Sequence, residues 1–145
     1  MSARPAGSES FWLVAAALVV GDQLTKYVIG QFREPFELAG VSVGKVVNMA
    51  GVFGISVPNA VLIFVNILIC LGLIFLLGAM VQRPPARLGL WLLLGGAVSN
   101  LFDRLTHGGV VDIISLFGSP RFNLADVMVI LGALSLLRST WWQRT

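Results

Sequence analysis

Residues 60–81 read AVLIFVNILICLGLIFLLGAMV, and Asn66 is the only strongly polar residue among them. A helix needs about 20 consecutive apolar residues to cross the hydrocarbon core of a bilayer, so this segment predicts a transmembrane helix. The whole chain agrees, because 57% of its 145 residues are hydrophobic and only 12% are charged. A soluble domain has about 45–50% apolar and about 25% charged residues. We therefore expect an integral membrane protein.

Three further apolar segments flank this one, at about residues 11–29, 88–105 and 124–137. The predicted fold class is an all-α membrane protein with four transmembrane helices, and we expect residues 1–145 to form a single domain. We interpret the first segment as a retained helix. A cleaved signal peptide would carry small residues at its end, where Gly21-Asp22 stands instead.

The longest connector, residues 32–56, has the pattern of β-structure. Phe36-Glu37-Leu38 and Val41-Ser42-Val43 alternate apolar with polar residues, which predicts a small sheet lying on the membrane surface. Residues 110–117 are apolar and rich in β-branched side chains. They predict either a strand or a re-entrant segment before the last span, since irregular backbone is tolerated where protein surrounds it.

Basic residues suggest the orientation of the four predicted spans. One side of the membrane receives Arg4, Arg83, Arg87, Arg138 and Arg144. The positive-inside rule makes this side cytoplasmic, so both termini are expected there and the 32–56 connector is extracytoplasmic. The other side receives Lys26, Arg33, Lys45, Arg104 and Arg121.

With this topology, polar residues of three spans meet near the outer membrane face. The first span ends near Asp22 and Lys26, the third ends at residues 100–104, and the fourth begins at residues 123–126. An ionisable side chain in or near hydrocarbon is costly and points to a functional site. We therefore expect one polar site at the outer face.

Asp112 and Asp126 are the candidates for chemistry at this site, because each stands alone in an apolar run. If both face one cavity, repulsion and burial raise one pKa, and the pair can share a proton. One carboxylate would then activate water while its protonated partner polarises a carbonyl. In the alternative interpretation Asp126 caps the last span and Asp112 pairs with Arg104 or Arg121.

Two helical groups could support this pair. Asn100, Asp103 and Arg104 share one helix face and can brace the pair or hold substrate, although Asp103 and Arg104 could instead form an interfacial ion pair. Asp22 and Lys26 are four residues apart and can pair on one face, which favours a structural role.

The remaining polar residues narrow the function classes. Asn48 precedes small residues that allow a peptide to approach closely, with a simple loop turn as the alternative. One cysteine, Cys70, and one histidine, His107, argue against a structural zinc site, and a net charge of +3 without a basic block argues against nucleic-acid binding. We expect no metal and no cofactor.

Taken together, five segments in order resemble the bacterial lipoprotein signal peptidase family, the type II signal peptidases, from about residue 21 to 132. The segments are Asp22-Gln23-Leu24-Thr25-Lys26, residues 48–53, residues 95–104, Gly109-Val110-Val111-Asp112-Ile113 and Phe122-Asn123-Leu124-Ala125-Asp126. The resemblance implies a four-helix membrane aspartic endopeptidase of the bacterial cytoplasmic (inner) membrane. Such an enzyme cleaves prolipoproteins just before a diacylglyceryl-modified cysteine.

The resemblance also implies roles for individual residues. Asp112 and Asp126 take the catalytic positions. The site and substrate backbone would be held by Asn48, Asn100, Arg104, Asn123 and Ala125, with support from Asp22, Lys26 and Asp103. The implied partners are the diacylglyceryl-modified prolipoprotein and membrane lipids, and we expect a monomer.

The chain departs from the family pattern at a few positions. Ala50-Gly51-Val52 replaces Gly-Ala-Ala, Ser99 replaces glycine, and Val127 replaces serine. Only 13 residues separate Asp112 from Asp126, which makes a short loop for the family. Because both aspartates are present, we expect these changes to affect substrate range rather than the class of reaction.

Two non-enzymatic alternatives are weighed against the peptidase. A small transport or proton-relay subunit would use the carboxylates as relays and would place polar residues at several depths along a path. In this chain they cluster at one depth, and residues 60–81 hold few of them. A purely structural assembly factor gives no reason for two isolated aspartates.

Overall fold

The computed structural model describes residues 10–49, 57–79 and 84–141, which form four helices and a three-stranded sheet. In chain order the elements are α1 (Phe11–Ile29), β1 (Phe36–Leu38), β2 (Val41–Asn48), α2 (Asn59–Ala79), α3 (Pro84–His107), β3 (Val110–Leu116) and α4 (Leu124–Trp141). The prediction of a mainly helical chain with a small β element is confirmed. Several predicted features lie outside the described residues, namely residues 50–56, Val81, Arg4, Arg83 and Arg144.

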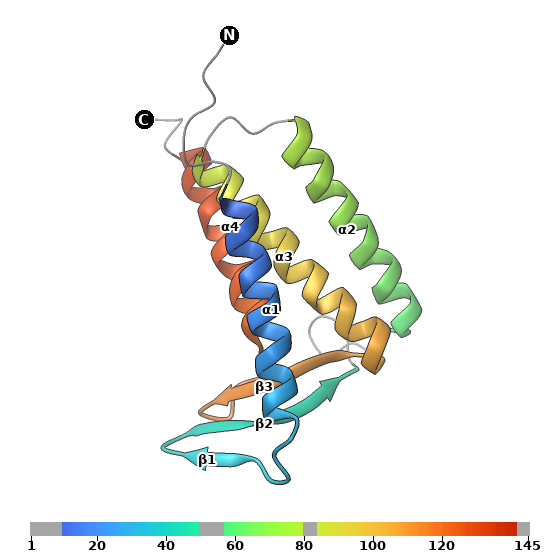
Figure 1. The fold of residues 1–145 in the computed structure, drawn as a ribbon, viewed down its shortest axis with the longest axis vertical. Coiled ribbons are helices and arrows are strands. Elements are labelled where there is room, and N and C mark those ends of the chain that lie inside the picture. Colours follow the sequence, from blue (N-terminus) through green and yellow to red (C-terminus); the bar gives the residue numbers. More distant parts are fainter. Residues whose placement is uncertain (1–9, 50–56, 80–83, 142–145) are drawn as a thin grey trace.

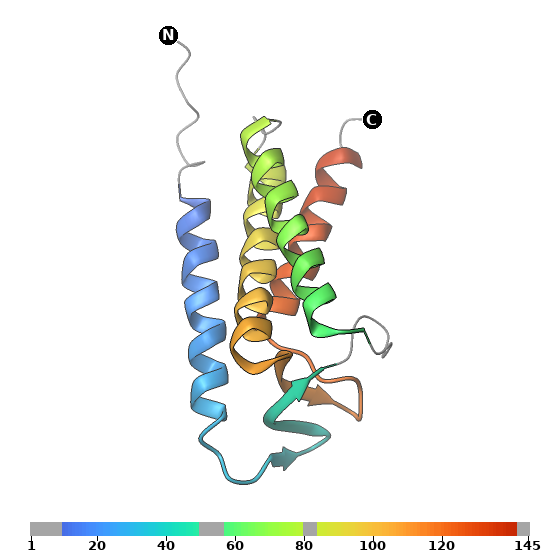
Figure 2. The same cartoon turned by 90° about the vertical axis from the view of Figure 1, so that its right-hand side faces the viewer.

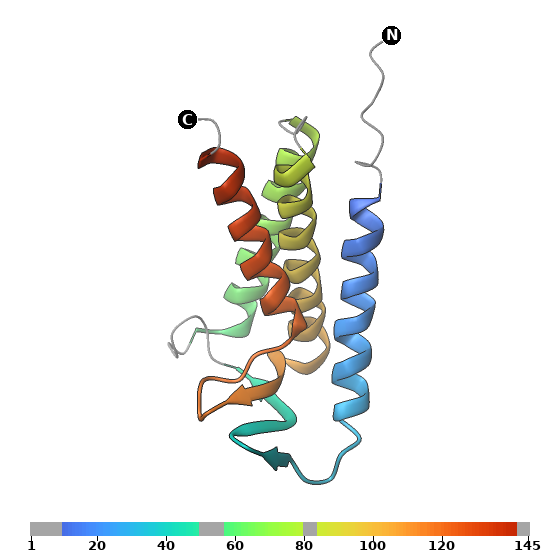
Figure 3. The same ribbon diagram turned by 90° about the vertical axis from the view of Figure 1, so that its left-hand side faces the viewer.

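The helices form a bundle around α3, against which α1, α2 and α4 each pack (Figure 1). Figure 2 shows α3 between α1 and α4, with α2 in front of it. The sheet lies across one end of the bundle, and the start of α1 and the end of α4 lie at the opposite end (Figure 3). The polar ends of three helices therefore meet the sheet.

Among the described helices, α1 and α2 are long and apolar enough to cross a membrane by length and composition. The helices α3 and α4 have 24 and 18 residues, so both extend beyond the predicted segments 88–105 and 124–137. The earlier start of α3 has a simple cause: Pro84 and Pro85 suit a first helical turn, where the backbone N–H has no partner in the helix.

The sheet has β2 at its centre, paired antiparallel with β1 on one side and β3 on the other. Ala39 and Gly40 connect β1 to β2 with φ of 50° and 84°, as a two-residue hairpin turn requires. A Cβ on Gly40 would also lie 2.6 Å from the Phe117 ring. The predicted alternation of residues 36–43 is thus confirmed as a hairpin, and residues 110–116 form a strand rather than a re-entrant segment.

Candidate active site

Asp112 lies in the third position of β3 and is only 3% exposed. Asn48, at the end of β2, donates from Nδ2 to Asp112 Oδ2 at 3.1 Å. Asn123 donates from Nδ2 to the other oxygen, Oδ1, also at 3.1 Å. The carboxylate of Asp112 is therefore held by two neutral amides from separate parts of the chain.

Asp126 lies in the first turn of α4 and is partly exposed. Its Oδ2 accepts from the backbone N–H of Asn123 at 3.1 Å, and Asn123 Oδ1 accepts from the N–H of Asp126 at 2.9 Å. This reciprocal pair is a capping box, so the expectation that Asp126 caps the last helix is confirmed. Asp126 Oδ1 remains available to Asn100, whose Nδ2 donates to it at 3.2 Å. Capping thus occupies only one oxygen of Asp126.

The short segment between the two aspartates brings them to the same place. After β3 the chain turns back, and Phe122 pairs with Ile114 through backbone hydrogen bonds of 2.8 and 3.0 Å. This return places Asn123 beside β3, where its Nδ2 also donates to the carbonyl of Val111 at 3.1 Å. Asn123 therefore contacts both Asp112 and Asp126.

The surroundings of Asp112 favour its protonated form. Burial raises the pKa of this carboxyl from 3.8 to about 6, and the nearby charge of Asp126 adds to the rise. Hydrogen bonds from Asn48 and Asn123 and the charge of Lys26 act in the opposite direction but do not cancel it. A carboxyl that titrates near neutral pH beside a second carboxylate can exchange a proton during a reaction.

Next to this pair lies a second cluster around Lys26, which is 4% exposed. Lys26 Nζ lies 2.5 Å from Asp22 Oδ2 and 2.6 Å from Asp103 Oδ2, and both aspartates are 0% exposed. The predicted pairing of Asp22 with Lys26 is confirmed. Since Asp103 pairs with Lys26, the alternative that paired Asp103 with Arg104 is wrong.

The two aspartates of this cluster also bind backbone groups of the neighbouring elements. Asp22 Oδ1 accepts from the N–H of Ala125 at 3.1 Å, and Asp103 Oδ2 accepts from the N–H of Val111 at 3.0 Å. Ala125 is 0% exposed, so this residue takes part in the site through its backbone.

Two residues of the Lys26 cluster were missed by sequence reasoning. Gln23 donates from Nε2 to Asp103 Oδ1 and to Ser99 Oγ, each at 2.9 Å. Ser99 in turn donates from Oγ to Asp22 Oδ2 at 2.6 Å. The available signals were the position of Gln23 between Asp22 and Lys26, and the departure of Ser99 from the family pattern, which was assigned to substrate range.

The basic residues near the site do not pair with Asp112, contrary to the alternative expectation. Arg121 donates to the carbonyl of Gly44 at 2.9 Å and to Ser42 Oγ at 3.1 Å, where the register of β2 shifts. Arg104 donates from Nη1 to the carbonyl of Asn100, one helical turn earlier, at 3.3 Å. Its charge still lies within electrostatic range of Asp112 and Asp126.

Asn100 carries a buried acceptor that is not satisfied within the described part of the chain. Its Oδ1 has no hydrogen-bond partner there, although its Nδ2 binds Asp126. A buried polar atom without a partner is unusual, and next to the Asp126 carboxylate it is a candidate acceptor for a bound molecule. Across residues 10–49, 57–79 and 84–141, no group of three or more His, Cys, Asp or Glu side chains could hold a metal ion.

A sequence model of the family described as Signal peptidase (SPase) II matches residues 14–142. The chain is 37% identical to the lipoprotein signal peptidase of Moorella thermoacetica over 135 residues, covering 87% of this chain and 89% of the relative. It is 36% identical to the lipoprotein signal peptidase of Gloeothece citriformis over 144 residues, covering 90% and 88%.

Two solved structures, both described as bacterial membrane enzymes crystallised in meso, share the fold. The first superposes with a TM-score of 0.85 at 24% identity, covering 94% of this chain and 90% of the other. The second has a TM-score of 0.80 at 25% identity, covering 91% and 92%.

Proposed function

Because this chain belongs to the signal peptidase II family, we propose that Asp112 and Asp126 are its catalytic residues. The chain is a bacterial membrane protease that removes signal peptides from prolipoproteins. The observation that supports the assignment most directly is the double contact of Asn123, which binds both carboxylates. Within the described residues the ion pairs belong to Lys26, so neither proposed catalytic carboxylate is neutralised by one.

The reaction follows from a pair of carboxylates that holds one proton between them. The ionised partner takes a proton from water as the water oxygen attacks the scissile carbonyl, and the protonated partner donates a hydrogen bond to the carbonyl oxygen. The resulting tetrahedral species collapses with loss of the C–N bond, and the leaving amine takes the proton that the ionised partner removed from water. The other carboxyl keeps its proton, so the pair again holds one proton. Burial biases the shared proton towards Asp112, which makes Asp126 the general base.

Four neighbouring residues are proposed to position the substrate. Asn48 is exposed and contacts Asp112, so it lies where a peptide can reach it. The unsatisfied Oδ1 of Asn100 can accept a backbone N–H. Arg104 lies within electrostatic range of both carboxylates, and Asn123 contacts both of them.

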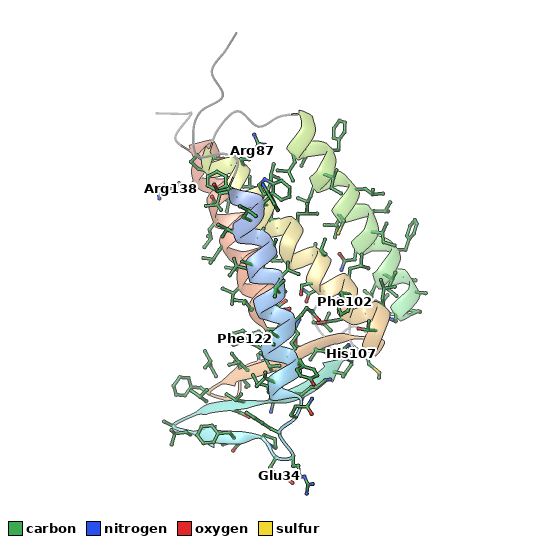
Figure 4. The ribbon with its side chains drawn as sticks, in the orientation of Figure 1. Glu34, Arg87, Phe102, His107, Phe122 and Arg138 are labelled. Atoms are coloured by element: carbon green, nitrogen blue, oxygen red, sulfur yellow. The ribbon has the colours of Figure 1, made fainter. Side chains whose placement is uncertain are left out.

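We place the sheet end of the bundle at the extracytoplasmic face and treat residues 1–145 as one monomeric domain with four spans. The 24 and 18 residues of α3 and α4 correspond to about 36 and 27 Å of helix, close to the ~30 Å of the hydrocarbon core. Figure 4 shows Phe102, His107 and Phe122 at the sheet end, and Arg87 and Arg138 at the other end. Arginines at that end support a cytoplasmic location for it.

The test is cleavage of a diacylglyceryl-modified prolipoprotein by purified protein in detergent, with the product analysed by mass spectrometry. Wild type should cut just before the lipidated cysteine. Asp112→Asn and Asp126→Asn should each lower the rate by about 10²–10⁴-fold, because each removes a proton-transferring group. Glu37→Gln is the matched control, since it changes an exposed carboxylate on β1 to an amide.

Substantial turnover by either folded Asp variant would remove that residue from the chemistry. Cleavage of the same substrate without its diacylglyceryl group would overturn the proposed substrate class. The transport alternative has no support from the arrangement, because the buried ionisable side chains of the described residues gather in one site at the sheet end and α2 carries few polar side chains.

A further inference from the structure

The carboxylates of the Lys26 cluster each bind the backbone one residue before a proposed catalytic residue. The N–H of Val111, which precedes Asp112, donates to Asp103 at 3.0 Å. The N–H of Ala125, which precedes Asp126, donates to Asp22 at 3.1 Å. These two contacts follow the same pattern, although they involve different helices and come from opposite ends of the β3–α4 connection.

Two separate links join Asp22 to Asp103. The first is ionic, because Lys26 Nζ contacts both carboxylates at 2.5 and 2.6 Å. The second is neutral and runs from Asp22 through Ser99 to Gln23 and on to Asp103, with hydrogen bonds of 2.6, 2.9 and 2.9 Å. The backbone at Val111 and the backbone at Ala125 are thus connected to each other through side chains of α1 and α3.

The charges make these links strong. Two carboxylates share one ammonium group, so the remaining negative charge is met by neutral donors, which include the N–H groups of Val111 and Ala125. Hydrogen bonds to ionised acceptors are roughly twice as strong as bonds between neutral groups. All three charged side chains are 4% exposed or less, so water does not compete for them.

We propose that Asp22, Lys26 and Asp103 are positioning residues that set the separation of Asp112 and Asp126 by holding the backbone immediately before each. The inference rests on the proposed catalytic role of that pair. Its physical basis is the sensitivity of catalysis to geometry, since a displacement of about 1 Å can lower a rate about 100-fold. The neutral link through Gln23 and Ser99 restrains the same separation.

The decisive comparison is Asp103→Asn against Asp103→Leu. Both changes remove the charge and leave Lys26 paired with Asp22, but only asparagine keeps an oxygen that can accept from Val111. We expect Asp103→Leu to lower kcat per folded molecule by about 100-fold with KM changed less than threefold. Asp103→Asn should keep at least ten times the kcat of the leucine variant. Asp22→Asn and Asp22→Leu form the same comparison for Ala125.

Equal kcat for the asparagine and leucine variants, with losses confined to the yield of folded protein, would overturn the proposal. If the leucine variants do not fold, Ser99→Ala decides. This neutral change breaks the second link and should lower kcat several-fold. Its control is Ser135→Ala, because Ser135 also donates a hydroxyl from one helix to another, to the Pro85 carbonyl at 2.7 Å, far from the site. Equal kcat for these two variants would reject positioning.

Asp112→Asn in the same assay separates this inference from the proposed function. If Asp112→Asn is inactive and Asp103→Asn and Asp103→Leu have equal kcat, the positioning role is rejected but the catalytic pair is not. An active Asp112→Asn rejects the catalytic pair itself.

Discussion

The four aspartates of this chain form two neighbouring pairs with opposite surroundings. Asp22 and Asp103 are fully buried and share the ammonium group of Lys26. Asp112 and Asp126 receive hydrogen bonds from the amides of asparagine residues and, in the described part of the chain, have no ion pair. The two pairs are connected through the backbone N–H groups of residues 111 and 125.

The difference teaches how one residue type serves two purposes within one site. A carboxylate that is paired with a buried cation is a fixed acceptor, so it can hold the backbone. Burial raises the pKa of Asp112, which has no ion pair in the described part of the chain, so this carboxyl can exchange a proton near pH 6. Removing the cation from the Asp22–Asp103 pair should therefore lower the stability of the fold, whereas replacing Asp112 with a neutral residue should raise it.

The largest effect is expected from Lys26→Met, which leaves Asp22 and Asp103 buried together without a cation. Removing one partner of a buried ion pair typically lowers the free energy of unfolding by about 3–5 kcal/mol. Thermal unfolding of the purified protein in detergent measures this loss. Lys45→Met is the control, because Lys45 is exposed on β2 and should give little change. Similar unfolding temperatures for both variants would mean that the Lys26 cluster contributes little to stability.

Asp112→Asn should change stability in the opposite direction. The pKa of Asp112 is raised from 3.8 to about 6, so its protonated form stabilises the fold. This contribution is fully present below about pH 4 and is lost as the pH rises through about 6. Above that pH the asparagine variant should be more stable than wild type by up to about 3 kcal/mol.

Chemical unfolding in detergent at pH 4, 6 and 7.5 checks this pH dependence. Asp103→Asn is the matched comparison, since it removes a charge from the other pair and should lower stability at neutral pH. An Asp112→Asn variant that is less stable than wild type at pH 7.5 would show that the ionised carboxylate is a net stabilising group.

A smaller and spatially selective effect is expected at two glycines where α3 and α4 touch. A Cβ on Gly96 would lie 2.6 Å from the carbonyl of Ala125, and a Cβ on Gly132 would lie 2.7 Å from the carbonyl of Gly89. Replacing either glycine by alanine should lower the free energy of unfolding by about 1–3 kcal/mol through overpacking. Only Gly96→Ala should also lower kcat, because Ala125 precedes Asp126. Equal kcat for the two variants would show that the contact of Gly96 with the Ala125 carbonyl does not affect catalysis.

Much of the site could be predicted because its members follow local rules. Asp22 and Lys26 are one helical turn apart, so their pairing follows from helix geometry alone. Asn123 and Asp126 have the spacing of a capping box, and the capping role of Asp126 was anticipated from its position at the start of a span.

The errors concern contacts between distant segments. One alternative paired Asp103 with its neighbour Arg104, but consecutive residues on a helix do not face each other, and Lys26 of α1 reaches Asp103 instead. The link from Gln23 to Ser99 spans 76 positions, and no local pattern predicts it.

The sequence by itself determined that this is a membrane protein with apolar helical segments at about residues 11–29 and 60–81, a small β element between them, and polar residues gathered near one end. These features depend on hydrophobic length and on the alternation of side chains, which neighbouring residues settle among themselves. Only the tertiary structure decided which carboxylates receive the single buried cation and which receive amides. That division depends on how α1, α3 and the β3–α4 return meet, because their packing brings Lys26 to Asp22 and Asp103 and places Asp112 against the amides of Asn48 and Asn123.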